Sequence, residues 1–261
     1  MTPAAVTTTN ETGRAVALAE QVKSGNVRAV SRLITLLENR HPDGAEGLRL
    51  LKADASPRNV IGVTGYPGAG KSTLISALVS AYRRQGMKVA VLAVDVSSTR
   101  TGGALLGDRI RMLEHAIDPG VYIRSMATRG HRGGLARTTD AARIVLEAAG
   151  YDVVVIETVG VGQNEADILN IAPTVVAVVA PGLGDDVQAM KAGLLELAHI
   201  IVVNKGDHPR ADSTIRDLRE WCPTVIGTVA TTGAGLSELL AAIAAHQRTL
   251  GSTNVHQRVE Q

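Results

Sequence analysis

Apolar residues along the chain change their spacing near residue 57. Before that point they recur every three or four residues in Arg14–Lys23 and Val27–Glu38, which is the spacing of one helix face. Ser24-Gly25-Asn26 separates these segments, so we expect two antiparallel helices, with a third, shorter helix over Asp43–Lys52. Asp54–Pro57 has the composition of a hinge. The first part of the chain is therefore predicted to be a small helical unit.

After the hinge, short apolar runs rich in β-branched residues alternate with helical patterns. The predicted strands are Val60–Thr64, Val89–Asp95, Tyr122–Ser125, Val153–Glu157, Val175–Val179, Ile200–Asn204 and Thr224–Thr228. The predicted helices are Ser72–Gln85, Asp108–Ala116, Gly134–Ala149, Gln188–Ala198, Asp212–Trp221 and Leu236–His246. Continuously apolar strands are typical of parallel sheets that are covered on both faces. The pattern predicts an α/β fold with a mostly parallel central sheet flanked by helices.

The loop after the first of these strands reads Gly65-Tyr-Pro-Gly-Ala-Gly-Lys71-Ser72, the pattern of a phosphate-binding P-loop. Its glycines let successive backbone N–H groups curl around phosphate oxygens, and the following helix N-terminus adds partial positive charge. We predict that Lys71 contacts the β- and γ-phosphates and that the Ser72 hydroxyl binds Mg²⁺. The predicted nucleotide-binding residues of the loop are Gly65, Pro67, Gly68, Ala69, Gly70, Lys71, Ser72 and Thr73.

Carboxylates follow two further strands, at the sheet edge where open α/β folds bind ligands. Asp95 ends the second strand, and Asp108 lies in the glycine-containing stretch after it. Glu157 ends another strand and precedes Gly160, where nucleotide switches commonly carry D-x-x-G. We predict that these three carboxylates hold Mg²⁺ or its water ligands, acting with Lys71 in catalysis, and that Gly160 binds the γ-phosphate. A helix N-cap is the alternative role for Asp95 or Asp108.

The stretch Asn204-Lys205-Gly206-Asp207 follows an apolar strand and has the N-K-x-D pattern of guanine-reading loops. The Asp207 carboxylate accepts hydrogen bonds from guanine N1–H and N2–H₂, a pair that adenine does not offer. Thr228–Gly235, with Val229 and Ala230, lies where a final loop backs onto the base. These motifs predict a GTPase that binds GTP or GDP with Mg²⁺. The expected organisation is a flexible tail over residues 1–13, a helical extension over 14–56, the P-loop GTPase domain over 57–250 and a second flexible tail over 251–261.

The composition of the chain limits the kinds of partner and the cellular compartment that we expect for the protein. The net charge of +2 is too small to favour nucleic acid or a membrane, and an aromatic content of 2% without Phe argues against stacking on single-stranded nucleic acid. No apolar stretch is long enough to span a bilayer, and Met1–Glu11 lacks the pattern of a signal peptide, so we expect a cytoplasmic protein. The single cysteine, Cys222, excludes an intrachain disulfide and a multi-cysteine metal site.

Several longer blocks resemble the MeaB/MMAA/ArgK group of GTPases, the chaperones of adenosylcobalamin-dependent acyl-CoA mutases. The most specific blocks are Val94-Asp-Val-Ser-Ser, Thr101-Gly-Gly, Glu157-Thr-Val-Gly-Val-Gly-Gln163 and Pro181–Lys191. The resemblance implies that GTP binding and hydrolysis gate the delivery of cobalamin to a mutase and the removal of damaged cofactor. It implies a mutase and an adenosyltransferase as partners, and a homodimer. Only ten residues follow Gly251, where members of the group carry a longer helical arm, so the form of the dimer stays open.

The resemblance also implies that residues 180–191 form a switch that relays the nucleotide state to the mutase. The glycines there permit movement, and the charged residues are able to exchange ion pairs between two arrangements. An ordinary strand-to-helix loop is the simpler interpretation without the resemblance. The predicted switch or partner residues are Gln163, Gly182, Asp185, Asp186, Gln188 and Lys191.

Hydrolysis is expected to be slow without the partner. Val161 follows Gly160, in the position where some GTPases carry a water-orienting Gln. Three other functions stay open at this point: a P-loop kinase that phosphorylates a protein or small molecule, a GTPase that delivers a metal to another enzyme, and a nucleotide-binding regulator without useful turnover. The client mutase, and whether cobalamin contacts this chain, also stay open.

Overall fold

The centre of the protein is a seven-stranded sheet in the order β3-β2-β4-β1-β5-β6-β7. The computed structural model describes residues 5–52, 59–95, 113–127, 134–159, 170–182 and 197–259. All six strand pairings are parallel, so the predicted fold class is confirmed. The strands are β1 (Asn59–Gly65), β2 (Val89–Asp95), β3 (Val121–Ala127), β4 (Val153–Val159), β5 (Thr174–Val179), β6 (Ile200–Val203) and β7 (Val225–Gly227).

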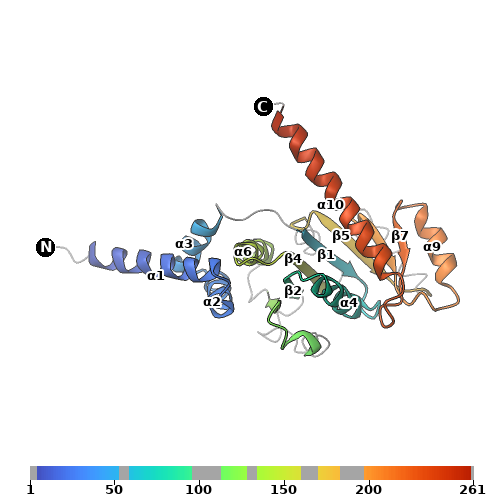
Figure 1. Cartoon of the computed structure of the whole chain (residues 1–261), viewed down its shortest axis with the longest axis horizontal. Coiled ribbons are helices and arrows are strands. Elements are labelled where there is room, and N and C mark those ends of the chain that lie inside the picture. Colours follow the sequence, from blue (N-terminus) through green and yellow to red (C-terminus); the bar gives the residue numbers. More distant parts are fainter. Residues whose placement is uncertain are drawn as a thin grey trace.

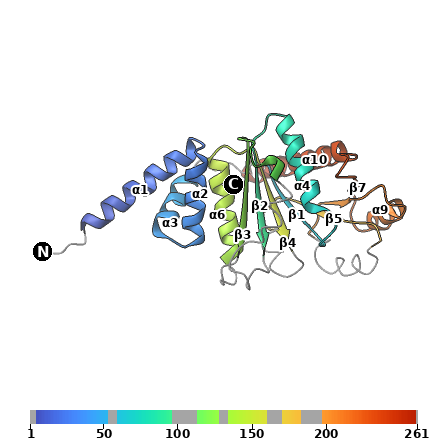
Figure 2. The same ribbon diagram turned by 90° about the horizontal axis from the view of Figure 1, so that it is seen from below.

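Helices cover both faces of this sheet and form a separate group at the N-terminal end (Figures 1 and 2). They are α1 (Ala5–Lys23), α2 (Val27–Glu38), α3 (Pro42–Leu51), α4 (Lys71–Arg84), α6 (Gly134–Ala148), α9 (Ala211–Arg219) and α10 (Leu236–Val259). Helix α1 already begins at Ala5 and helix α10 continues to Val259, within the two segments that the sequence predicts to be tails. Helix propagation adds a hydrogen bond for each residue, and one glycine such as Gly251 costs only about 1 kcal/mol, so polar composition alone does not end a helix.

Successive strand residues pack into different layers, as continuous burial requires. Val60 belongs to the core under α6, whereas Ile61 belongs to the opposite core under α4 and α10. Helix α9 packs over β6 and β7 through a third, smaller cluster that includes Leu218 and Val203. The sheet is thus buried on both sides, which leaves its carboxyl edge as the place where loops gather.

The N-terminal helices pack mainly against α6, as the ribbon shows (Figure 2). Helix α2 begins at its N-cap Asn26, whose side chain accepts from two backbone N–H groups, and it buries Val30 and Leu33 completely. On α1, Ala15 and Ala19 are buried, whereas Val16 is 37% exposed.

One ion pair joins this helical group to the sheet. Arg124 on β3 donates through Nη2 to Glu38 Oε2 on α2 at 2.7 Å and to Thr35 Oγ1 at 3.0 Å. The Nη1 group of the same guanidinium donates to the Ser31 carbonyl at 3.3 Å. Both charged side chains are largely buried, at 15% exposed for Arg124 and 7% for Glu38. The contact fixes α2 on β3, whose last residue Ala127 pairs with Asp95 at the carboxyl edge of the sheet.

Two predicted helices fall mainly outside the described residues. Of Asp108–Ala116, the described part contains only the 3₁₀ turn η2 (Leu113–His115). Of Gln188–Ala198, the described residues Leu197 and Ala198 are not helical. No helix among the described residues is long and apolar enough to cross a membrane.

Candidate nucleotide-binding site

The loop from Gly65 to Gly70 has the backbone that the P-loop pattern predicts. Gly65 closes β1 with φ 137°, and a Cβ there would lie 2.0 Å from the Val178 carbonyl oxygen. Gly68 and Gly70 have φ 81° and 93°, in the left-handed region that favours glycine. Helix α4 begins at the next residue, so its N-terminal N–H groups face the loop. The geometry provides the concave set of amides that binds phosphate.

The Lys71 side chain lies within this loop. Its Nζ donates to the Gly65 carbonyl at 2.6 Å and to the Tyr66 carbonyl at 3.1 Å, and the residue is 8% exposed. A positive charge therefore sits between the loop backbone and the start of α4. This is the position from which a lysine neutralises phosphate charge.

Ser72 and Glu157, predicted to serve the same metal, are in contact. Ser72 Oγ donates to Glu157 Oε1 at 2.9 Å, and both residues are buried. Glu157 stands on β4 between Val63 of β1 and Ala93 of β2, in register with both. Mg²⁺ prefers oxygen ligands such as carboxylates, hydroxyls and phosphates. The Ser72 hydroxyl and the Glu157 carboxylate are therefore suitable ligands for this ion.

Asp95 belongs to the same edge of the sheet. It is the last residue of β2, and its Cα pairs with Val159 of β4, two residues beyond Glu157. The structure describes its backbone and not its side chain, so its metal role stays a prediction. Among the described residues no group of three or more His, Cys, Asp or Glu side chains is arranged to hold a metal.

Asn204 joins three loops of the site. Its Nδ2 donates to the Ala69 carbonyl of the P-loop at 3.0 Å. Its Oδ1 accepts from Thr228 Oγ1 at 3.2 Å and from the Ala230 N–H at 3.0 Å. Asn204 is buried, so these bonds fix the N-K-x-D loop and the final loop on the P-loop. A residue assigned from sequence to guanine reading also holds the loops together.

The rest of the N-K-x-D loop faces solvent. Lys205 has φ 58°, and the Gly206 N–H donates to the Thr228 carbonyl at 2.8 Å. Asp207 follows on the exposed side of this turn, free of the core. Val229 forms an antiparallel bridge to Ala234 that closes the final loop beside it. The loops are arranged so that an Asp207 carboxylate is available to a planar base.

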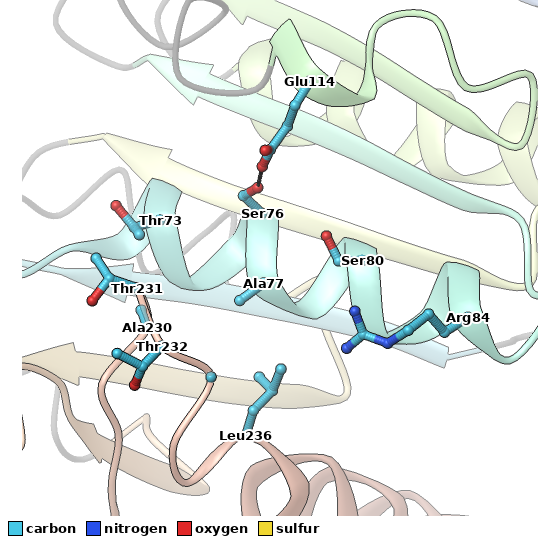
Figure 3. Close-up of a pocket in the computed structure, with 11 residues that line it drawn as sticks. Thr73, Ser76, Ala77, Ser80, Arg84, Glu114, Ala230, Thr231, Thr232 and Leu236 are labelled. Carbon is cyan, nitrogen blue, oxygen red and sulfur yellow. Dashed lines mark hydrogen bonds between the residues drawn. The ribbon is translucent and has the colours of Figure 1, made fainter.

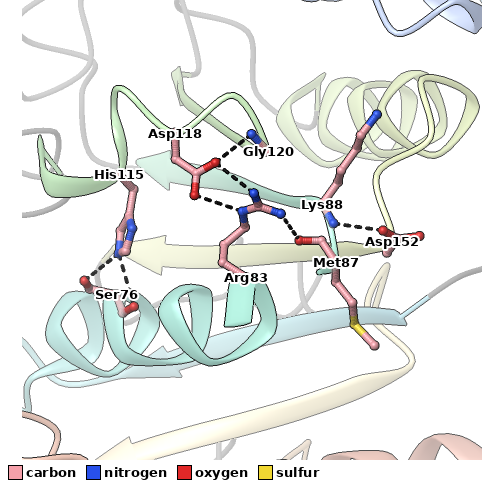
Figure 4. A network of polar contacts seen from close by, with 8 residues as sticks. All are labelled: Ser76, Arg83, Met87, Lys88, His115, Asp118, Gly120 and Asp152. Carbon is pink, nitrogen blue, oxygen red and sulfur yellow. Dashed lines mark hydrogen bonds and ion pairs between the residues drawn. The ribbon is translucent and has the colours of Figure 1, made fainter. Parts of the chain in front are cut away.

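Sequence patterns missed a set of contacts between α4 and residues 114–120 (Figure 4). His115 Nε2 lies 2.9 Å from Ser76 Oγ, and Glu114 accepts a hydrogen bond from the same hydroxyl. Further along α4, Arg83 binds both carboxylate oxygens of Asp118 at 2.9 Å. Ser76 stands one helical turn after Ser72, a spacing that marks it as facing the site. Its partners come from a distant segment, which no local pattern reveals.

The remaining predicted residues lie outside the described part of the chain. They are Asp108, Gly160, Gln163, Asp185, Asp186, Gln188 and Lys191. Gly182 is the last described residue before residues 183–196. It has φ 90°, and a Cβ on it would lie 4.0 Å from His208 Cε1. The predicted switch segment therefore starts beside the N-K-x-D loop.

The parallel sheet, the P-loop and the N-K-x-D loop define the class of the protein as a P-loop GTPase. The family model for the methylmalonyl-CoA mutase-associated GTPase MeaB matches residues 30–261. The chain therefore belongs to the MeaB family, which confirms the resemblance of its sequence blocks.

Individual relatives agree with this assignment. A protein of Pyrococcus horikoshii named as a GTPase is 50% identical over 246 residues, covering 89% of this chain and 78% of its own. The mouse mitochondrial methylmalonic aciduria type A homolog is 35% identical over 243 residues, covering 82% of this chain and 59% of its own. A solved structure named LAO/AO transport system kinase superposes with a TM-score of 0.74 at 29% identity, covering 95% of this chain and 79% of that one.

Proposed function

We propose that this GTPase depends on Mg²⁺ and that its nucleotide state gates cobalamin loading and protection of an adenosylcobalamin-dependent acyl-CoA mutase. The observation that carries the proposal is the Ser72–Glu157 contact at 2.9 Å. It joins the first turn of α4 to strand β4, which leads directly into the segment beginning at Gly160. A change at the phosphates is thereby linked to the loop that follows β4.

Each part of the nucleotide has a place in this proposal. The backbone amides of Gly68 to Ser72 and the Lys71 ammonium bind the phosphates. Ser72 and Glu157 hold Mg²⁺, with Asp95 and Asp108 contributing through water. When bound, the ion neutralises charge that develops on the phosphate oxygens during hydrolysis. Water then needs only to be positioned, because phosphoryl transfer to water requires little covalent chemistry from the protein.

The mutase partner rests on the family description and on the mouse relative. Two loops at the carboxyl edge suit the relay, since Gly160 follows β4 and Gly182 follows β5. We infer that Gln163, Asp185 and their neighbours contact the mutase directly. A homodimer, a contact with an adenosyltransferase and a cytoplasmic location complete the proposal.

GTP hydrolysis by the purified chain, alone and with methylmalonyl-CoA mutase, tests the function. We expect a slow basal rate that EDTA abolishes and that the mutase increases. A rate that no acyl-CoA mutase changes would contradict the chaperone role. ATP preference with transfer of phosphate to an acceptor would establish the kinase instead.

An Asp207→Asn variant tests the base assignment. An asparagine amide donates where the aspartate accepts, so it disfavours guanine and fits xanthine, which carries a carbonyl at C2. We expect GTP hydrolysis to fall and XTP hydrolysis to rise. Asp212→Asn, an exposed aspartate at the start of α9, is the matched control and should change neither. Unchanged GTP use by Asp207→Asn would refute the assignment.

A further inference from the structure

A groove of about 380 Å³ crosses the outer side of α4 (Figure 3). One wall is Glu114, and the opposite wall is the final loop from Ala230 to Gly233. Side-chain hydroxyls line much of its surface: Thr73, Ser76, Ser80, Thr231 and Thr232. Its volume lies within the range of small-molecule sites, roughly 300–1,000 Å³. The groove suits a ligand rich in hydroxyl groups.

The position of the groove relates it to the two ends of a bound nucleotide. Thr73, at one end of the groove, is in the first turn of α4, where helix N–H groups face phosphate. Ala230, on the opposite wall, donates to Asn204 of the guanine-reading loop. The ribose of a nucleotide connects the phosphates to the base. A ribose that joins phosphates at Thr73 to a base beside Ala230 would lie at the Thr73 end of this groove.

Glu114 places a carboxylate on one wall of the groove. Its side chain is 65% exposed, and its Oε1 already accepts from Ser76 on the groove floor. An ionised carboxylate has about four lone-pair sites, so it is able to accept from two adjacent hydroxyls as well. Dinucleotide-binding folds use an acidic side chain in this way on ribose. A vicinal diol is the chemistry that this wall fits.

The same segment is fixed in place by the contacts of Figure 4. His115 Nε2 lies 2.9 Å from the hydroxyl and 3.2 Å from the carbonyl oxygen of Ser76. Asp118 pairs with Arg83 of α4, and this hydrogen bond is the main cause that lowers the Asp118 pKa. A Cβ on Gly120 would lie 2.1 Å from the Arg83 guanidinium, so the turn packs directly on it. Glu114 is therefore held over α4 before a ligand arrives, which reduces the entropy cost of binding.

We propose that Glu114, positioned by Ser76, recognises the ribose hydroxyls of the guanine nucleotide and makes this protein selective for ribonucleotides. The inference rests on the proposed binding of GTP and GDP at the P-loop. It adds a specificity-determining residue at the sugar, outside the motifs that read phosphate and base.

Binding of GDP and of 2′,3′-dideoxy-GDP, measured by calorimetry on the full chain, tests the proposal. Hydrogen bonds to a charged acceptor are worth about tenfold or more in affinity, so the unmodified protein should bind GDP at least about tenfold more tightly. Glu114→Gln should reduce this ratio to about twofold by weakening GDP binding alone. Ser76→Ala should lower the ratio too, because it releases the carboxylate. Ser24→Ala, at an exposed serine in the turn before α2 and outside the groove, is the matched control and should leave the ratio unchanged.

The two levels of the proposal fail differently. If the unmodified protein binds neither nucleotide, the nucleotide assignment itself is wrong. If it binds both equally well, or if Glu114→Gln keeps the full ratio, GTP binding stands and the sugar contact is refuted. A merely structural role of Glu114 would weaken both nucleotides by the same factor, which also overturns the inference.

Discussion

The contribution of the buried ion pair between Arg124 and Glu38 to the stability of the protein can be tested quantitatively. This pair joins the N-terminal helices to the GTPase domain. Glu38→Met removes the carboxylate and keeps a side chain of similar length that favours helix. Arg124 then retains its bonds to Thr35 and Ser31 but loses its charged partner in a largely buried place. Breaking one side of a buried pair costs about 3–5 kcal/mol, because the remaining charge is left without compensation.

A control pair with the same shortest N–O distance separates the effect of burial from that of distance. Glu46 and Arg49 on α3 also meet at 2.7 Å, but their side chains are 32% and 68% exposed. Solvent screens such pairs, so Glu46→Met should cost at most about 1 kcal/mol. Removing both buried charges with Glu38→Met and Arg124→Met should recover much of the loss, since an apolar pair replaces the ionic one.

Thermal unfolding followed by circular dichroism measures these differences. At roughly 2–4 °C for each kcal/mol in a chain of this size, Glu38→Met should lower Tm by about 10 °C and Glu46→Met by less than about 4 °C. Equal shifts for the two single variants would show that burial does not set the cost. A double variant less stable than Glu38→Met alone would refute the charge argument and point to lost packing.

Three further predictions follow from single contacts. Gly65→Ala should abolish nucleotide binding, because its Cβ would lie 2.0 Å from a carbonyl oxygen. Gly68→Ala meets no atom within 4 Å, so it should cost only the strain of its positive φ, about 1 kcal/mol. Calorimetry with GDP on both variants compares the two effects. Asn204→Ala removes three hydrogen bonds and should lower the free energy of unfolding by about 3 kcal/mol, measured by denaturant titration. Burial lowers the pKa of His199 and of His246 below 6.5, so their contribution to stability is complete above pH 6.5 and is lost as the pH falls below it. His199→Asn keeps a hydrogen-bond acceptor without titrating, so its stability should fall less between pH 7 and pH 5; an unchanged slope would exclude His199 as a cause.

Much of the fold was predictable because the strands are apolar without interruption. A run such as Val153–Ile156 has no polar face, so it fits only the middle of a covered sheet, where β4 in fact lies. The P-loop was predictable for a similar reason, since Gly65 and Gly70 mark backbone angles that other residues rarely adopt. Helix ends were less predictable: α1 and α10 continue through residues whose propensity is only weakly unfavourable.

The contacts that assemble the site were not predictable from local patterns. Asn204 reaches Ala69 across 135 positions of the chain, and Ser76 reaches His115 across 39. Spacing along a helix or strand predicts which side of the element a residue faces, but only the packed structure determines which distant residue it contacts. Sequence patterns therefore predict candidate nucleotide-binding residues, but not the distant contacts that position the loops around them.

Helix α4 connects these parts of the protein into one unit. Its first turn carries Lys71 and Ser72, its outer side binds the segment of Glu114, and its last turn holds Asp118 through Arg83. The segment that α4 holds comes directly after residues 96–112, which contain the predicted metal ligand Asp108. A displacement of α4 by nucleotide binding would thus be transmitted to residues 114–118 and to Glu157 on β4. Because packed helices shift between discrete arrangements rather than deform continuously, this is the element through which the P-loop is best able to report its occupancy to a partner.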